Sequence, residues 1–238
     1  MKSKAFFCAA CALVISCFLA SAPPRVKDEY LKRATADENK RISQLSAAIV
    51  AMNITDLKRQ SEKNIEILNQ RIKAADNRLS ALAGQKRYLV ENEKLYVLTG
   101  EAEKRAGAIA AIKENESDAA SQRIYLEYLR AKIADEKLLL QVKQAELGLK
   151  VAELKLTEAR IARKFQDSPE YSIPGADAKD PKAAKALEKD KIDLSQYEKY
   201  YELQSKTLAE KQQERRKTTD ILKQAEDRLK ESGYKVEQ

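Results

Sequence analysis

The sequence predicts an all-α protein whose long helices form an antiparallel coiled-coil hairpin or an elongated three-helix bundle, with no sheet. Three observations support this prediction. The 238 residues include 34% charged residues, six glycines, five prolines and no tryptophan, a composition typical of coiled coils and long helices. No proline lies between Pro24 and Asp167, where the strongest helix formers predominate. Apolar residues recur there at alternating steps of three and four, the heptad spacing of helices that wind around one another.

The first residues have the features of an export signal. Lys2 and Lys4 precede a nearly uncharged apolar run from Ala5 to Ile15, and small residues follow this run. An apolar run of about 11 to 14 residues is too short to cross a bilayer as a helix. We therefore expect this segment to direct export.

Two processing sites compete in the signal. The motif Ala20-Ser21-Ala22 has the form that ordinary signal peptidase favours, but cleavage there would leave Pro23 first, and proline fits a protease cleft poorly. The alternative, the segment VISC that ends at Cys17, resembles the relaxed lipobox of bacterial lipoproteins, in which the cysteine receives the lipid. We expect residues 1–16 to form a signal peptide, Cys17 to be the lipid attachment site and residues 17–25 to form a tether.

Cysteine usage agrees with export under either alternative. All three cysteines lie within the first 17 residues. If the lipobox is not used, Cys17 belongs to the apolar region of the signal, as Cys8 and Cys11 do. Cleavage at either site leaves no free thiol, so no disulfide can form. Such a chain suits an oxidising compartment without gaining a covalent cross-link from it.

Residues 26–165 are predicted to form one long helical region. Two heptad stripes run through its first half, with a slip near the segment NITD between them, and further breaks are expected at Thr99-Gly100 and at 113–118. The stripes consist of Ile42, Leu45, Ile49 and Met52, and then of Ile65, Leu68, Ile72, Ala75, Leu79 and Leu82.

The strongest apolar pattern lies in 138–165, where two stripes form a face wider than a two-stranded seam requires. This helix is therefore expected to contact two neighbours and to occupy the centre of a small bundle. The first stripe is Val142, Ala145, Leu149, Ala152, Leu156 and Ala159, and the second is Leu140, Leu147, Val151, Leu154, Ile161 and Phe165.

Residues 166–182 are predicted to be a proline-rich connection, because three of the five prolines and Gly175 lie there. A C-terminal helical arm is expected over 183–233 and a tail over 234–238. Asp180 before Pro181 is typical of a helix start, and Ser195 with Glu198 has the spacing of a capping box, so a short helix at 182–190 is expected to precede the long one. Gly233 suits the left-handed residue that ends a helix.

The C-terminal arm keeps one heptad register for 36 residues. Its middle is polar from Gln204 to Thr218, which predicts either polar residues that fix the register or a segment that extends beyond its partner. If the chain folds back near Gly175, facing residue numbers sum to about 350, which places Leu149 near Tyr201 and Leu156 near Leu194. The register consists of Leu194, Tyr197, Tyr201, Gln204, Leu208, Lys211, Arg215, Thr218, Leu222, Ala225 and Leu229.

Little in the sequence indicates catalysis. Histidine is absent, which removes the commonest general base and metal ligand, and no thiolate is left for zinc or iron–sulfur binding. Carboxylates are plentiful, but acid–base catalysis needs a pocket that shifts their pKa values, and long helices rarely enclose one. We predict no catalytic, cofactor-binding or metal-binding residue and do not expect an enzyme.

One tyrosine admits two interpretations. Tyr197 and Tyr201 lie on one side of the predicted helix, whereas Tyr200 points about 100° away from Tyr201. Tyr200 is either a docking residue or, as is commoner, an aromatic residue that is partly covered beside the core.

The formal net charge of +8 does not indicate nucleic-acid binding, because the charges are interleaved and not clustered into a basic stripe. The excess of positive charge would still favour anionic lipid headgroups or acidic polymers. The expected partners are therefore membrane lipid, reached through N-terminal acyl chains, and envelope proteins or further copies of the chain, with no nucleic acid.

The lipobox at Cys17 and the helical composition together resemble the broad class of coiled-coil bacterial envelope lipoproteins. This resemblance implies a helical spacer or scaffold on the periplasmic side of the outer membrane, although a soluble periplasmic or cell-surface location stays open.

One alternative is a periplasmic holdase, similar to the basic chaperones of outer-membrane protein assembly, whose β-stranded body this chain lacks. The other is an adaptor of a secretion or efflux complex, because residues 144–161 resemble the hairpins of membrane-fusion proteins, without their β-rich domains.

Overall fold

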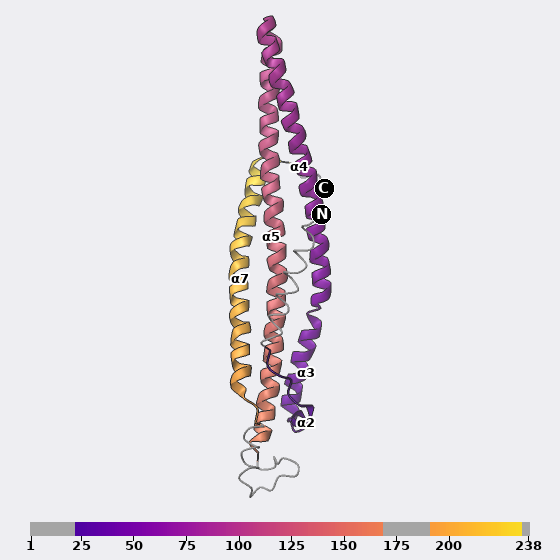
Figure 1. The fold of residues 1–238 in the computed structure, drawn as a ribbon, viewed down its shortest axis with the longest axis vertical. Helices are drawn as coiled ribbons and strands as arrows, with labels where there is room; N and C mark the ends of the chain where they lie inside the picture. The colour runs from indigo at the N-terminus through magenta and orange to yellow at the C-terminus, as the bar shows by residue number, and fades with distance from the viewer. Residues whose placement is uncertain (1–21, 169–190, 235–238) are drawn as a thin grey trace. The chain divides into compact units, whose positions relative to one another are not determined.

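The structure is a computed structural model that describes residues 22–168 and 191–234. These residues are helical apart from short connections, and none of them lies in a strand, which confirms the all-α prediction. The signal peptide, Cys17, most of the predicted connection and the predicted helix at 182–190 lie outside the described residues. In chain order the described helices are α2 (Asp28–Leu31), α3 (Ala36–Ala51), α4 (Ile54–Thr99), α5 (Ala102–Gln166) and α7 (Leu194–Glu231) (Figure 1).

The chain divides into two compact units, and α5 and α7 each contribute to both. Unit 1 consists of Met1–Ile54 and Lys143–Glu210, so that α2 and α3 pack with the end of α5 and the start of α7. Unit 2 consists of Thr55–Val142 and Lys211–Gln238, and contains α4, the first part of α5 and the last part of α7.

The N-terminus of α3 is fixed by a capping box that was not recognised in the sequence. The Thr35 hydroxyl accepts the backbone N–H of Glu38 at 3.3 Å, and the Glu38 carboxylate accepts the backbone N–H of Thr35 at 2.7 Å. The helix ends at the predicted slip, where Asn53 takes a positive φ of 38° before α4 begins. Asparagine tolerates this left-handed backbone better than most residues, so the break is confirmed and explained.

In unit 2, α4 and α5 form an antiparallel hairpin that turns at Gly100. Gly100 has a φ of +71°, a conformation that L side chains rarely adopt, and the predicted break there is confirmed. Contacts along the hairpin include Asn64 Nδ2 donating to Glu136 Oε1 at 3.2 Å and Arg105 Nε donating to Glu93 Oε1 at 3.1 Å.

The predicted break at 113–118 is wrong, because α5 runs through it without interruption. The segment KENESD contains no glycine or proline, so nothing in its backbone forces a turn. Asn115 is instead buried against α4, where its amide nitrogen donates to Gln85 Oε1 at 3.4 Å. A polar residue that suggested a turn therefore forms an interhelical contact.

The core of unit 2 is built from the predicted stripe of α4 and from residues of α5 and α7. Leu129 lies at its centre and is only 1% exposed. Helices α5 and α7 pair in antiparallel orientation, and their register differs from the predicted one by only a few residues. Arg228 contacts Glu127 at 3.2 Å, and Thr219 donates to Asp135 at 2.8 Å. The buried residues of this core are Leu68, Ala75, Tyr125, Leu126, Leu129, Ile133 and Leu229.

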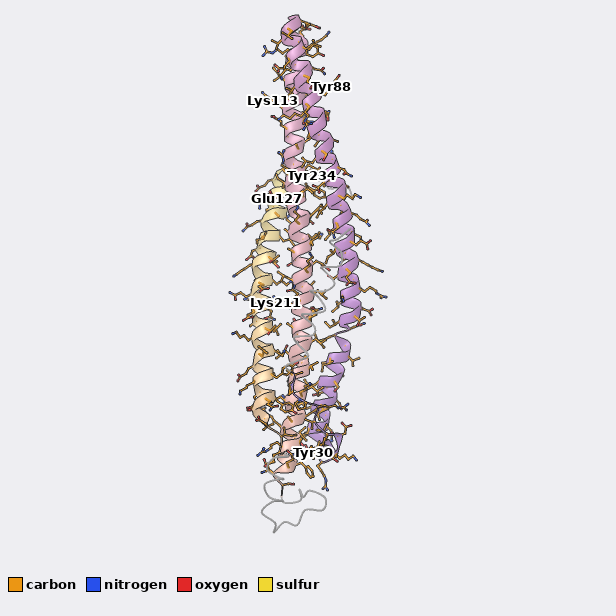
Figure 2. The ribbon with its side chains drawn as sticks, in the orientation of Figure 1. Tyr30, Tyr88, Lys113, Glu127, Lys211 and Tyr234 are labelled. Atoms are coloured by element: carbon orange, nitrogen blue, oxygen red, sulfur yellow. The ribbon has the colours of Figure 1, made fainter. Side chains whose placement is uncertain are left out.

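The end of α7 is tied to unit 2 by Tyr234. Its hydroxyl donates to Gln122 Oε1 at 2.8 Å, and its ring stacks on Tyr125 with the centroids 4.8 Å apart (Figure 2). Gly233 takes a φ of +67°, as the sequence predicted for this helix end, and Tyr234 packs on the cluster that contains Leu229.

In unit 1, α5 contacts neighbours on two faces, as the two stripes predicted. Ala152, Ala159 and Ala162 are fully buried, and small side chains at these positions let the neighbouring helices approach closely. The predicted neighbours Leu156 and Leu194 belong to the same core. Its buried residues are Val26, Tyr30, Leu156, Ala159, Ala162 and Tyr197.

The capping box predicted at Ser195 and Glu198 is wrong. Helix α7 already begins at Leu194, and the preceding Asp193 accepts the backbone N–H of Ser195 at 3.0 Å. Hydrogen bonds from Ser195 lower the pKa of the Asp193 carboxyl, as expected for an ionised N-cap. The cap therefore lies two residues earlier in the chain than the sequence pattern indicated.

The polar middle of the α7 register begins with a buried residue. Gln204 is 1% exposed and its Nε2 has no hydrogen-bond partner among the described residues. Its Oε1 lies 2.6 Å from the position that a Cβ on Gly148 would occupy, so the missing side chain of Gly148 makes room for the amide. Of the two interpretations of this polar segment, burial of Gln204 favours a residue that restricts register.

We expect Gln204→Met to stabilise unit 1 by about 1–2 kcal/mol, because an unsatisfied buried donor is replaced by an apolar chain of similar size. Denaturant unfolding followed by circular dichroism measures the change. Gln213→Met, at an exposed position of α7, should change stability by less than about 0.5 kcal/mol. A loss of stability in Gln204→Met would contradict the assignment of an unsatisfied amide.

Candidate functional site

The residues that follow the predicted anchor are held against unit 1. We call this feature the N-terminal clasp and define it as residues 22–31 with the side chains of α5 and α7 that contact them. The carbonyl of Pro23 accepts Lys155 Nζ at 3.0 Å, and the carbonyl of Pro24 accepts the Tyr197 hydroxyl at 2.9 Å. Because neither proline has an N–H, their carbonyls are the only backbone groups that need partners there.

Apolar burial holds the rest of the clasp. Val26 is 4% exposed and Tyr30 is 6% exposed, and both pack in the core of unit 1 with Leu156. The Tyr30 ring lies 6.2 Å from the Phe165 ring, between centroids, at a tilt of 42° (Figure 2). The single turn of α2 brings Tyr30 into this position. The last residues of the predicted tether, from Pro23 onward, are thus held against the helices, whereas residues 17–21 lie outside the described residues.

A carboxyl group lies half-buried beside the clasp. Burial raises the pKa of Glu158, while the positive charge of Arg25 opposes this shift and the negative charge of Asp28 adds to it. The pKa of the neighbouring Tyr197 hydroxyl is also raised, mainly by burial and further by the charge of Glu158. These groups share one environment in which the uncharged forms are favoured.

The raised pKa of Glu158 has a testable consequence for stability. Because the folded-state pKa lies above the usual value of 4.5, Glu158 contributes stability while it is protonated, and this contribution is lost as the pH rises through the folded-state pKa. We expect Glu158→Gln to raise the melting temperature at neutral pH by up to about 2–4 °C, a gain below about 1 kcal/mol because the group is partly exposed. Scanning calorimetry at neutral and acidic pH measures it.

The gain should disappear at a pH below the usual carboxyl pKa, where Glu158 is protonated in both states. Glu202→Gln, on the exposed side of α7, provides the matched control and should show no such dependence. A stabilisation that persists unchanged in acid would show that Glu158 acts through something other than its charge.

Tyr200 is not available for docking. It is 9% exposed, Lys155 Nζ lies 5.8 Å from its ring centroid, and burial raises the pKa of its hydroxyl. This confirms the interpretation of Tyr200 as an aromatic residue covered beside the core. Cys17, the predicted lipid attachment site, lies outside the described residues.

The end of α5 and the residues that precede α7 contact each other. Asp167 pairs with Arg163 at 3.0 Å and with Lys191 at 3.2 Å, and Arg163 is the main cause of the lowered pKa of the Asp167 carboxyl. The buried Gln166 side chain accepts the backbone N–H of Ile192 at 2.8 Å. These contacts fix where α5 ends and where the chain enters α7.

In unit 2, the α4–α5 hairpin extends past the end of α7 (Figure 1). Tyr234, which follows the end of α7, contacts Gln122 of α5, and the part of the hairpin nearer its turn is held by pairs such as Lys86 with Glu116 at 2.8 Å. Large apolar side chains are exposed there, and the sequence stripes did not include them. They are Tyr88, Leu95, Val97, Leu98 and Ile109.

No cluster of acidic side chains in the described ranges could hold a metal ion. No helix within 22–168 or 191–234 is both long and apolar enough to cross a membrane. The features that remain for function are the N-terminal clasp and the exposed side chains of the α4–α5 hairpin.

Comparison of the chain with protein-family models, with curated proteins and with solved structures finds no match.

Proposed function

We propose that the chain is an exported structural protein of the bacterial cell envelope, anchored by acyl chains on Cys17, that serves as a helical spacer or scaffold in an assembly. The observation that carries the proposal is the N-terminal clasp. The export signal and lipobox-like segment supply the route and the attachment chemistry. The clasp supplies a mechanical connection between such an anchor and the helices.

The connection would be short. Five residues separate Cys17 from Pro23, and six extended residue steps span at most about 20–22 Å. From Pro23 onward the chain is held by the hydrogen bonds from Lys155 and Tyr197 and by burial of Val26 and Tyr30. Acyl chains at Cys17 would therefore keep unit 1 close to the membrane surface, on the periplasmic side of the outer membrane.

The proposal needs stable attachment to the membrane. One acyl chain gives only marginal binding, and the three chains implied by the lipoprotein resemblance provide stable anchoring. The helices would then act through the surfaces that they present to partners, with envelope proteins or further copies of the chain as the expected occupants.

Substitution of the proposed attachment site tests this function. In cells fed labelled fatty acid, we expect the wild-type chain to carry label and to sediment with membranes, and Cys17→Ala to lose the label. Cys11→Ala is the matched control, because it removes a thiol from the same apolar region and should keep both properties. Equal labelling of all three chains, or none in the wild type, would overturn the anchor.

A further inference from the structure

Helix α4 carries a second heptad stripe on the side that does not face the core. The inner stripe of α4 packs in unit 2, whereas this outer stripe follows its own steps of three and four over 32 residues and is exposed throughout. Figure 2 shows Tyr88 on the outside of the hairpin. The outer stripe consists of Ile67, Gln70, Ala74, Asn77, Ala81, Gly84, Tyr88, Glu91, Leu95 and Leu98.

The composition of the outer stripe is unusual for a surface in water. Only Glu91 is charged among its ten positions, although 34% of the whole chain is charged. Tyr88 is 63% exposed, Leu95 is 53% exposed and Leu98 is 85% exposed. Large apolar residues at heptad spacing on one helix face are typical of a surface that packs against another helix.

We infer that the outer stripe packs against the outer stripe of a second copy of this chain, with the two α4 helices antiparallel. When the two outer stripes are aligned in opposite directions, Ile67 of each copy faces Leu98 of the other at the two ends, and Ala81 faces Gly84 at the centre. Gly84 has no neighbour within 4 Å of the position that a Cβ would occupy, so a second helix can approach closely there. The polar members of the stripe fall opposite Tyr88 and Leu95, and polar residues at seam positions restrict register.

The charges beside the stripe favour a second copy over an unrelated partner. In the antiparallel arrangement, Glu91 faces Ala74 of the other copy, and Arg71 and Arg78 lie one helical turn to either side of that alanine. All three charged residues are exposed, and the described part of the chain offers none of them an ion pair within 4.0 Å. Two-fold symmetry would repeat the contact, so each copy supplies both the acidic and the basic side.

Charge reversal tests this pairing in the full-length chain. Two forms with different affinity tags are expressed together, extracted in detergent and purified through one tag. We expect wild-type chains to co-purify, and Glu91→Arg to reduce association with itself at least tenfold, because two attractive contacts become repulsive. Arg71→Glu with Arg78→Glu should weaken self-association to a similar degree.

The decisive arm combines the two variants. Glu91→Arg expressed with Arg71→Glu/Arg78→Glu should recover association to within about threefold of wild type, since opposite charges face each other again in the mixed pair. Arg216→Glu, an exposed charge on α7 and not on the helix that carries the stripe, should leave association unchanged. Leu95→Ser with Leu98→Ser should abolish it while helix content measured by circular dichroism is retained.

Absence of co-purification between wild-type chains would overturn the inference. Failure of the mixed pair to recover association would overturn the antiparallel register and with it the proposed occupant. A third outcome would assign the stripe to another envelope protein. In that case the other protein would co-purify with the wild-type chain but not with Leu95→Ser/Leu98→Ser, while self-association would be the same in both. The inference does not rest on lipid attachment at Cys17, so either can fail alone.

Discussion

Replacing Leu129 by alanine is expected to cost unit 2 about 2–5 kcal/mol of unfolding free energy. Leu129 is 1% exposed and lies in a cluster supplied by three helices, which includes Leu68 of α4 and Leu229 of α7. Truncation leaves a cavity that the packed helices can close only in part, so both the lost burial and the cavity contribute. Denaturant unfolding gives the total change, and amide hydrogen exchange shows whether protection is lost in unit 2.

Leu203→Ala is the control for this prediction, because Leu203 is 48% exposed on α7 and the same truncation should cost less than about 0.5 kcal/mol. If Leu129→Ala cost no more than the control, the three helices of unit 2 could not share the core described for them.

The second large effect is expected at the N-terminal clasp. Tyr197→Ala removes a buried ring from the core of unit 1, for which about 3–5 kcal/mol is the usual cost of a large aromatic residue. It also removes the donor to the Pro24 carbonyl. We expect residues 22–31 to exchange their amide protons at the rate of an unstructured peptide in this variant, as measured by hydrogen exchange with mass spectrometry.

Tyr197→Phe separates the two contributions, because the ring stays and only the hydroxyl is lost. It should cost about 1 kcal/mol, the typical net value of one hydrogen bond, and leave most of the protection in residues 22–31. Equal loss of protection in both variants would mean that the hydrogen bond to Pro24, and not apolar burial, holds the clasp.

Heptad spacing predicted most of the helical packing, because burial of apolar side chains depends mainly on helix periodicity. Ile72 and Leu79 on α4 and Leu156 on α5 lie where the stripes placed them. The antiparallel pairing of α5 with α7 followed from the proline-rich connection between them. These features are local or repeat along the chain, so a single sequence contains enough information to predict them.

Local signals failed where a tertiary contact or a neighbouring residue competed with them. Asn115 resembled a turn residue, but the Gln85 side chain gives its amide a partner inside a continuous helix. Asp193 caps α7 in preference to Ser195, because both residue types are good N-caps and the pattern does not say where the helix starts.

The clasp could not be predicted from local patterns at all. Pro23 and Lys155 are separated by 132 positions, and Pro24 and Tyr197 by 173. No periodicity connects a proline carbonyl to a side chain so far along the chain. The outer stripe of α4 could have been predicted from the sequence, since Tyr88, Leu95 and Leu98 have heptad spacing. Only the inner stripe of this helix was recognised there, and it ends at Leu82.

Lipid anchoring at Cys17 is tested most directly by the mass of the amino-terminal peptide of the mature protein, isolated from membranes of the native cells. If the protein is anchored as proposed, this peptide begins at Cys17 and carries a diacylglyceryl group on the cysteine sulfur and an acyl chain on the amine. A peptide that begins at Pro23 without lipid would contradict the anchor and leave the N-terminal clasp as the free end of the chain.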